Sequence, residues 1–357
     1  MKILFVITQL GVGGAEKVTV NLAEEMSNLG HTVEIVSLID IVEIATKIKV
    51  IKLNFNKNFF QSFFKLRKLI KKFRPDIVHS HCIHANVIVR LMRLTISFDK
   101  LISSAHSSNE AVGLIMKIYK YTNWLSDYNT NVSNQAVQIY YKNGYIKLNN
   151  MKVMYNSINL DDFKFQNFNR ISYRKYFNIH ENEKIMLSVG AFKEAKDYPN
   201  LIKSIFQLKK KYNLNNKLYI AGDGLLIDSI KELAINLGVE NQVFFLGKRS
   251  DISKLMSMAD IFVLSSSYEG LPTVLIEAIM GECVIVSTNC EGVGEILSDN
   301  RLIANVGSPS ELADKIKLAV SFSNQEAKEH IANNLDYVVS KFCKEKIINS
   351  WLDLYES

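Results

Sequence analysis

The chain alternates short apolar runs with amphipathic helical patterns, and the alternation occurs twice. Continuous apolar runs such as "IMLSVG" and "DIFVLSS" are typical of parallel strands buried on both faces of a sheet. In the first half, strands are predicted at residues 2–7, 32–38, 50–54, 76–81, 101–106, 128–133 and 151–155. The helical patterns between them include residues 15–29, 59–73, 84–94, 111–124 and 135–143. This pattern predicts a doubly wound α/β domain.

After a polar stretch at residues 156–180 the alternation restarts. Further strands are predicted at residues 185–190, 217–221, 243–247, 261–265, 283–287 and 302–305. Further helices are predicted at residues 198–211, 225–237, 252–259, 272–280, 309–320 and 325–335. We therefore expect two Rossmann-like domains, at residues 1–165 and 166–339. Because ligands of doubly wound sheets bind at the carboxyl ends of the strands, we expect the site in a central cleft that both domains face.

Composition is ordinary for a globular protein with a substantial core. Of 357 residues, 48% are apolar and 22% are charged. The four cysteines (Cys82, Cys283, Cys290 and Cys343) form no C-x-x-C pair, which argues against a disulfide framework and favours a reducing compartment. The apolar start is short and passes through "GVGG" directly into a helical pattern, so it predicts a first strand rather than a signal peptide. The sequence therefore predicts a cytoplasmic protein.

The positive charge lies in the first half. Residues 1–165 carry 21 Lys and Arg against 12 Asp and Glu, whereas residues 166–357 carry 22 against 24. The excess of 21 − 12 = 9 positive charges predicts that the first half meets any anionic surface.

Two carboxylates stand out in the apolar stretch "SSSYEGLPTVLIEAIMGE", residues 265–282. Pro272 suits the first position of a helix and Gly281 its end, so Glu269 precedes the helix and Glu277 lies inside it. The rise from Pro272 to Glu277 is roughly 7–8 Å. A helix N-terminus favours a phosphate, and a carboxylate accepts two hydrogen bonds from a sugar diol. A solvent-facing helix position is the alternative for Glu277.

The segment "SSSYEGLPTVLIEA" resembles the E-x7-E element of retaining, nucleotide-sugar-dependent glycosyltransferases of family four, which have the two-Rossmann GT-B architecture. The resemblance covers essentially the whole chain, because the other family motifs occur in family order. These are "GVGGAEKVTVNLAEEMSNLGHTVEIVSL", "RPDIVHSH", "SVGAFKEAKDYPNLIKSI", "LYIAGDG" and "VFFLGKRSDISKLMSMADIFVLSS". It also implies that the last helix, within residues 340–357, crosses back to the first domain.

On the donor side, the resemblance implies that Glu269 hydrogen-bonds the donor sugar. The backbone N–H groups of Gly270 and Leu271, in the turn that ends at Pro272, would lie near its phosphate. Glu277 would hold the ribose diol.

The glycine-containing strand ends of the donor half are also implied to bind the nucleotide. Lys196 would face the diphosphate, where charge develops as the nucleotide leaves. Gly190 and Gly222 belong to the same donor-binding set. The family usually has arginine after the first of these glycines, where this chain has Ala191. Lys193 partly substitutes as a point charge without the bidentate fork.

On the acceptor side, the resemblance implies that the loop with Gly13, Gly14 and Glu16 approaches phosphate or acceptor closely. His106, at the end of "LISSAH", would face the reacting sugar. A hydrogen-bonded histidine at a strand end is the alternative. A second departure is "NSIN" at residues 156–159, where the family has "NGID".

No metal site is expected. His79, His81 and His84 lie on one strand and its exit, and their spacing supplies no further ligand. No D-x-D motif occurs, and the family needs no metal or other cofactor.

The basic segment "FFQSFFKLRKLIKKFR", residues 59–74, contains six cations and no acid. A buried stripe is predicted for Phe59, Phe63, Leu66, Ile70 and Phe73. Phe60 and Phe64 instead project among Arg67, Lys68 and Lys71, which suits an anionic bilayer surface. The alternative is a solvated basic face whose two phenylalanines pack under a neighbouring loop.

The function implied is transfer of a hexose or N-acetylhexosamine, with anomeric retention, from a UDP-sugar to a membrane lipid-linked sugar acceptor. Assembly of surface polysaccharide (O-antigen, capsule or lipopolysaccharide) is the expected setting, on the inner face of the cell membrane. With no evident carboxylate nucleophile in the first domain, front-face attack is favoured. The sequence does not specify the sugar, the linkage or the oligomeric state.

Other classes of protein remain as alternatives. A nucleotide-sugar epimerase of the same architecture would release a changed sugar without an acceptor. An inactive homologue would bind nucleotide and transfer nothing, and Ala191 is the residue that supports this alternative. A dehydrogenase is disfavoured because the third glycine of its fingerprint falls at Glu16. Nucleic-acid binding is disfavoured because the cations are not interleaved with a reading element.

Overall fold

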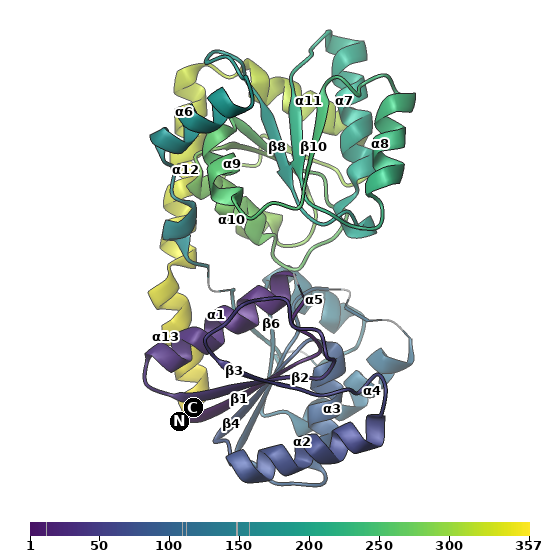
Figure 1. Ribbon diagram of the computed structural model, residues 1–357, viewed down its shortest axis with the longest axis vertical. Coiled ribbons are helices and arrows are strands. Elements are labelled where there is room, and N and C mark those ends of the chain that lie inside the picture. The colour runs from purple at the N-terminus through teal and green to yellow at the C-terminus, as the bar shows by residue number, and fades with distance from the viewer. Residues whose placement is uncertain (12, 109, 112, 148, 157) are drawn as a thin grey trace. The chain divides into compact units, whose positions relative to one another are not determined.

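The computed structural model describes every residue of the chain except 12, 109, 112, 148 and 157 (Figure 1). The chain divides into two units. The first unit comprises Met1–Ile158 together with Lys344–Ser357, and the second comprises Asn159–Cys343. The division after Ile158 falls within the polar stretch at residues 156–180, seven residues before the expected boundary after residue 165.

The described residues of the first unit form a seven-stranded parallel sheet in the order β3-β2-β1-β4-β5-β6-β7. The strands are β1 (Lys2–Ile7), β2 (Thr32–Ser37), β3 (Lys49–Lys52), β4 (Ile77–His81), β5 (Lys100–Ser104), β6 (Tyr128–Asn131) and β7 (Lys152–Val153). Strands β1 and β4 are buried almost throughout, as continuous apolar runs predict.

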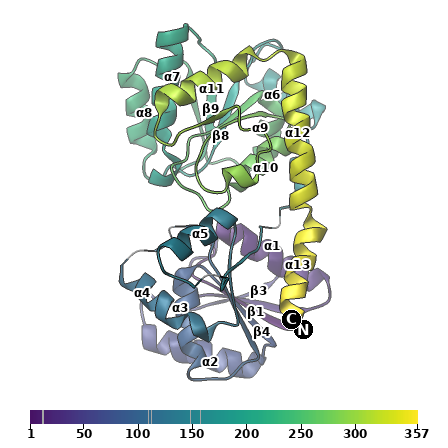
Figure 2. The same ribbon diagram turned by 180° about the vertical axis from the view of Figure 1, so that it is seen from behind.

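Helices cover both faces of this sheet (Figures 1 and 2). They are α1 (Gly14–Asn28), α2 (Phe59–Phe73), α3 (Ile83–Arg93), α4 (Leu114–Thr122), α5 (Asn134–Lys142) and α13 (Lys344–Glu356). Helices α2 and α3 share one core cluster with the sheet, to which they contribute Leu66, Ile70, Ala85 and Val89.

Helix α13 belongs to the first unit although it ends the chain. It buries Ile347, Ile348, Trp351, Leu354 and Tyr355, and Nζ of Lys344 lies 2.7 Å from Oε1 of Glu25 in α1. The aromatic residues of the last helix therefore cover the first unit.

In the second unit the described residues form a six-stranded parallel sheet in the order β10-β9-β8-β11-β12-β13. Its strands are β8 (Met186–Val189), β9 (Leu218–Ala221), β10 (Val243–Gly247), β11 (Ile261–Leu264), β12 (Val284–Thr288) and β13 (Ile303–Ala304). Its helices are α6 (Asn167–Tyr176), α7 (Tyr198–Tyr212), α8 (Ile227–Asn236), α9 (Ile252–Met258), α10 (Thr273–Met280), α11 (Pro309–Ser321) and α12 (Asn324–Phe342). The predicted pair of doubly wound α/β domains is confirmed.

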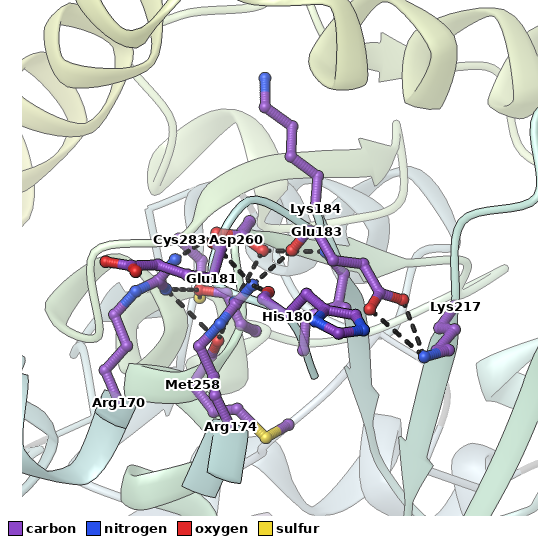
Figure 3. A network of polar contacts seen from close by, with 12 residues as sticks. Arg170, Arg174, His180, Glu181, Glu183, Lys184, Lys217, Met258, Asp260 and Cys283 are labelled. Atoms are coloured by element: carbon purple, nitrogen blue, oxygen red, sulfur yellow. Dashed lines mark hydrogen bonds and ion pairs between the residues drawn. The ribbon is translucent and has the colours of Figure 1, made fainter. Parts of the chain in front are cut away.

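Two helical features differ from the sequence prediction. Helix α6 lies inside the stretch that was interpreted as a polar connection, and α12 continues to Phe342, beyond the predicted end at residue 335. Helix α6 lacks a broad apolar face, and hydrogen bonds and ion pairs of its arginines attach it to the rest of the second unit. Arg174 donates to the carbonyl oxygens of His180 and Glu181 and to the carboxylate of Asp260, and Figure 3 shows it reaching toward these groups.

Among the described residues, no helix is both long enough and apolar enough to cross a membrane.

Candidate functional site

The loops that leave β8 and β11 bring a lysine and a glutamate into contact. Lys196 ends the 3-10 turn Glu194–Lys196 after β8, and Glu269 lies in the loop after β11. Nζ of Lys196 is 2.6 Å from Oε1 of Glu269, and the two side chains are 14% and 17% exposed. The structure therefore joins the residue expected at the diphosphate to the residue expected at the donor sugar.

Neighbouring polar groups fix this ion pair. Oγ of Ser266 donates to the same carboxylate oxygen of Glu269 at 2.8 Å, and the backbone N–H of Glu269 donates to Glu291 at 3.3 Å. Oγ of Ser265 donates to the carbonyl oxygen of Lys196 at 2.8 Å, which ties the two loops together. No motif or periodicity in the sequence indicated these roles of Ser266 and Glu291.

Glycines let the strand exits of the second unit approach each other by backbone alone. A Cβ on Gly222, whose φ is +156°, would lie 1.9 Å from the carbonyl oxygen of Gly190. A Cβ on Gly292, whose φ is +79°, would lie 2.6 Å from the carbonyl oxygen of Gly270. Only glycine fits at Gly222 and Gly292, because the carbonyl oxygens of Gly190 and Gly270 are backbone atoms that cannot turn away.

Helix α10 begins at Thr273 with Pro272 as its N-cap, one residue later than expected, and Gly281 is its C-cap. No described residue accepts a hydrogen bond from the backbone N–H of Gly270 or Leu271. These two groups are therefore available to an anion at the N-terminus of α10. Glu277 lies on the half-buried face of this helix.

The residues that replace the family's arginine are exposed. Ala191 and Lys193 flank the buried Phe192, and the N–H of Lys193 donates to the carbonyl oxygen of Ala191 at 2.9 Å. The cation at Lys193 therefore lies at the surface of the loop that carries Lys196. The other departure, at residues 156–159, includes Ser157, which lies outside the described residues.

Three histidines form a row at the carboxyl ends of β4 and β5 in the first unit, in which His79 and His81 are buried and His106 is half-buried. Nδ1 of His81 lies 2.9 Å from Nε2 of His106, and the rings of His79 and His81 are 4.0 Å apart. His79 contacts the hydroxyls of Ser104 at 2.7 Å and Tyr355 at 2.8 Å. Burial lowers the pKa of each histidine, that of His106 to about 4. All three rings are therefore neutral near pH 7.

The contact between His81 and His106 couples their tautomers. Nε2 of His81 and Nδ1 of His106 are buried without a described partner. A neutral imidazole carries one N–H, so if His81 donates from Nδ1, His106 must carry its proton on Nδ1. In that state His106 offers an unsatisfied donor, which suits a sugar hydroxyl.

Glu110, in the loop after β5, holds this histidine by its backbone. Its carboxylate accepts from the N–H groups of His106, Ser107 at 3.0 Å and Ile83 at 3.0 Å. Burial raises the pKa of Glu110 to about 7, the three N–H donors act in the opposite direction, and Glu16 raises it further. Sequence reasoning missed Glu110, because a single glutamate in a polar loop gives no signal of such contacts.

The first loop lies at the same end of the sheet. Helix α1 begins at Gly14, and Gly13 precedes it in an extended conformation. Glu16 lies in the first turn, where its charge contributes to the raised pKa values of Glu110 and Cys82. Gly13, Gly14 and Glu16 therefore lie at the same end of the sheet as His106, and Glu16 acts electrostatically on Glu110, which holds the backbone of His106. The described residues contain no cluster of three His, Cys, Asp or Glu side chains able to hold a metal ion.

Helix α2 exposes the two phenylalanines expected at its polar face. Phe60 is 76% and Phe64 is 64% exposed, and Lys68 and Lys71 are also exposed. Arg67 differs, because its guanidinium donates to the carbonyl oxygen of Thr95 after α3.

Two family models match consecutive parts of the chain. The model described as glycosyltransferase family 4 matches residues 12–162, and the model described as glycosyl transferases group 1 matches residues 169–335. The chain belongs to the family 4 glycosyltransferases, as its motifs predicted.

Relatives and solved structures agree with this assignment. A Campylobacter jejuni protein named "GalNAc-alpha-(1->4)-GalNAc-alpha-(1->3)-diNAcBac-PP-undecaprenol alpha-1,4-N-acetyl-D-galactosaminyltransferase" is 29% identical over 371 residues, which cover 99% of this chain and 98% of that protein. The Rhizobium meliloti lipopolysaccharide core biosynthesis glycosyltransferase LpsE is 30% identical over 175 residues, 48% of this chain and 50% of LpsE. The structure of Anabaena HepE in complex with UDP aligns over 100% of both chains with a TM-score of 0.85 and 19% identity, which shows the GT-B fold.

Proposed function

We propose that this protein transfers a hexose or N-acetylhexosamine from a UDP-sugar to a membrane lipid-linked sugar acceptor during assembly of a surface polysaccharide. The contact of Lys196 with Glu269, beside the available N–H groups of Gly270 and Leu271, carries the proposal. The end-to-end similarity to a transferase whose name contains an undecaprenol diphosphate sugar supports the class of acceptor. The UDP complex of HepE supports the class of donor.

The donor-side residues have separable roles in this proposal. The N–H groups of Gly270 and Leu271 and the ammonium of Lys196 bind the diphosphate, so that negative charge is stabilised as it develops on the leaving nucleotide. Glu269 accepts from a hydroxyl of the donor sugar, and Glu277 accepts from the ribose diol. His106 of the first unit donates from Nδ1 to the donor sugar.

Retention by front-face attack completes the proposed mechanism. The bond between the anomeric carbon and the diphosphate oxygen breaks, and the acceptor oxygen bonds to the same face of that carbon. The proton of the acceptor hydroxyl passes to the departing diphosphate. Glu110 is poorly suited to act as a covalent nucleophile, because both carboxylate oxygens already accept backbone hydrogen bonds. No metal or other cofactor is assigned a role.

The decisive experiment measures release of nucleotide from a panel of UDP- and GDP-sugars, with and without a lipid-diphosphate-sugar acceptor. Release that requires the acceptor would support transfer. Release without an acceptor, together with a changed free sugar, would instead support an epimerase.

Glu269→Gln separates binding of nucleotide from transfer. The variant keeps the shape of the side chain but removes the charge that neutralises Lys196 in the free protein. We expect UDP to bind as tightly as in the wild type or more tightly, and acceptor-dependent release to fall about a hundredfold or more. Calorimetry with UDP and the release assay measure the two quantities. Equal losses of UDP affinity and of nucleotide release would contradict the role of Glu269 at the sugar. If the wild type binds UDP but releases no nucleotide, an inactive homologue is favoured, and Ala191→Arg would test whether the missing arginine is the cause.

We also propose that the protein is cytoplasmic and peripheral on the inner face of the cell membrane, through the exposed surface of α2. Aromatic side chains beside cations suit an anionic bilayer surface. Replacing Phe60 and Phe64 with serine should weaken binding to anionic vesicles while UDP binding stays unchanged, which cosedimentation and calorimetry would measure. Unchanged vesicle binding would exclude these phenylalanines as membrane contacts.

A further inference from the structure

A groove of about 570 Å³ runs between α2 and the sheet of the first unit. Five lysines line it: Lys2, Lys49, Lys65, Lys68 and Lys72. Glu34 is the one acidic residue of the lining, so the groove carries 5 − 1 = 4 net positive charges. A concave surface with this charge favours an anionic ligand.

Most of these ammonium groups lack an internal partner. Glu34 is paired with Lys49 at 2.7 Å. Within the part of the chain that the structure describes, no carboxylate lies within ion-pair distance of the ammonium groups of Lys2, Lys65, Lys68 or Lys72, although Asp76 accepts from the backbone N–H of Lys2 at 2.6 Å. The fold brings four mutually repelling cations together without neutralising them, which is an arrangement that an incoming phosphate would stabilise.

The groove is separate from the candidate functional site. Lys2, Thr32 and Lys49 are the first residues of β1, β2 and β3, and all three line it. His81 and His106 instead lie at the carboxyl ends of the strands in the same sheet. Because the strands are parallel, the two places lie at opposite edges of the sheet, about 20 Å apart for a six-residue strand.

The lysines share the lining of the groove with apolar side chains, which distinguishes the groove from a site for a small free anion. Ile51, Leu69 and Phe73 are half-buried, line the groove and pack against the core cluster beneath. A ligand that fits this lining has an anionic group for the lysines and hydrocarbon for the wall. A phospholipid has both.

Helix α2 also links the groove to the exposed phenylalanines. Phe60, Phe64, Lys68 and Lys72 follow one another at a spacing of four residues, so they form one row along the helix. A lipid held by the lysines would therefore lie beside aromatic side chains of a kind that enter a bilayer surface.

We propose that this groove binds the phosphate-bearing headgroup of an anionic phospholipid. The ammonium groups of Lys2, Lys65, Lys68 and Lys72 contact the phosphate, and Ile51, Leu69 and Phe73 contact the glycerol backbone and the start of the acyl chains. The inference extends the membrane contact in the proposed function, on which it rests, and it does not depend on the identity of the sugar or of the acceptor.

The test compares two double variants of equal charge in the full-length chain. Lys65→Gln with Lys72→Gln removes two charges from the groove, and Lys47→Gln with Lys57→Gln removes two exposed lysines outside it. Cosedimentation with phosphatidylcholine vesicles, with and without phosphatidylglycerol, gives the affinities. We expect the groove variant to bind the anionic vesicles about tenfold or more weakly than the control variant. Equal losses in the two variants would overturn the proposal, because they would indicate diffuse attraction of the whole positive surface.

Two further measurements identify the ligand of the groove and separate the lipid-binding proposal from the proposed sugar transfer. Inorganic phosphate at millimolar concentration should not displace the protein from anionic vesicles, and displacement would show that the groove takes free phosphate instead of lipid. UDP binding and acceptor-dependent nucleotide release are measured on the same variants. Loss of vesicle binding by the groove variant with UDP binding intact supports the groove. If the wild type binds vesicles but releases no nucleotide, the result contradicts the proposed sugar transfer and leaves the proposed lipid-binding groove untouched.

Discussion

Glu110 and His106 are half-buried neighbours whose protonation affects the free energy of unfolding in opposite directions. Burial raises the pKa of Glu110 to about 7, so the folded protein holds a proton that the unfolded chain releases above its ordinary pKa of 4.5. This contribution to the free energy of unfolding falls as the pH rises from 4.5 to 7. Burial lowers the pKa of His106 from 6.5 to about 4, so the contribution of this histidine rises between pH 4 and 6.5.

Replacing Glu110 with glutamine should separate the contribution of Glu110 to the free energy of unfolding from that of His106. The variant keeps one of the two acceptor oxygens and cannot ionise, so it loses a contribution that does not depend on pH, and of the two contributions that depend on pH only the falling one disappears. Its free energy of unfolding, relative to that of the wild type, should increase between pH 4.5 and 7 by at most about 3 kcal/mol and then stay constant. Urea denaturation at a series of pH values would measure this difference. A difference that is flat across the range would show that the carboxylate is solvated well enough to ionise normally.

Hydrogen bonds position the residues for which the sequence predicted no role at the site. His81, Glu110 and Glu291 contact residues distant in the chain or backbone groups, and Ser266 contacts the side chain of Glu269 in the same loop. Periodicity and motif spacing carry no information about such partners. Glu269, Lys196 and Gly222 were found because they belong to motifs in family order.

At the scale of elements, α6 depends on its arginines. Arg174 has a side chain only 6% exposed and donates to carbonyl oxygens of the following loop and of Met258, and to Asp260. Arg170 contacts the other oxygen of Asp260 at 2.6 Å but is 27% exposed (Figure 3). Asp260 also accepts from the N–H of Ile185 at 2.8 Å, just before β8. These contacts join α6 to the amino-terminal edge of the sheet.

Arg174→Met should destabilise the second unit by about 3–5 kcal/mol, because it removes a buried cation that pairs with Asp260 and donates to the carbonyl oxygens of the following loop and of Met258. Arg170→Met is the matched control, and about 1–2 kcal/mol is expected there because water can replace the lost contact. Denaturant unfolding followed by circular dichroism would measure both. Equal effects of the two substitutions would contradict the central role of Arg174.

The same network explains why α6 escaped prediction while most other elements were found. The strands that were predicted well are continuous apolar runs, and the helices have an apolar stripe that faces the sheet. In α6 the buried residue is Arg174, so hydrophobic periodicity gives no signal there. The buried positions in the extension of α12 to Phe342 are the apolar Val338 and Phe342, but they follow the polar buried residues His330 and Asn334, which interrupt the hydrophobic stripe.

For the whole molecule, the last helix completes the first unit. Tyr355 of α13 contacts Nδ1 of His79, whose ring also packs against Trp351 with centroids 4.8 Å apart. The sequence showed that the last helix needs an apolar partner. Only the family resemblance indicated which domain supplies it, because the amphipathic pattern of one helix does not identify the surface that it covers.

Tyr355→Phe should weaken the docking of α13 by about 1–3 kcal/mol, because it leaves a buried nitrogen of His79 without a partner. Trp351 is buried, and the other tryptophan, Trp124, is exposed. Replacing Trp124 with phenylalanine therefore makes Trp351 fluorescence a reporter of α13. Its emission should shift to longer wavelength at lower urea concentration in the Tyr355→Phe variant, whereas Tyr121→Phe, at an exposed position, should leave the transition unchanged.

The place of α13 in the first unit has a consequence for synthesis on the ribosome. Residues 1–158 emerge first, yet the surface that holds His79 stays uncovered until the whole second unit and then residues 344–357 have been translated. A nascent first unit therefore exposes a buried histidine and the apolar positions that Ile347, Ile348 and Trp351 later cover. Chaperones that bind apolar segments should associate with this intermediate, and ribosomes that stall before codon 344 should yield chains in which His79 lacks its contact with Tyr355.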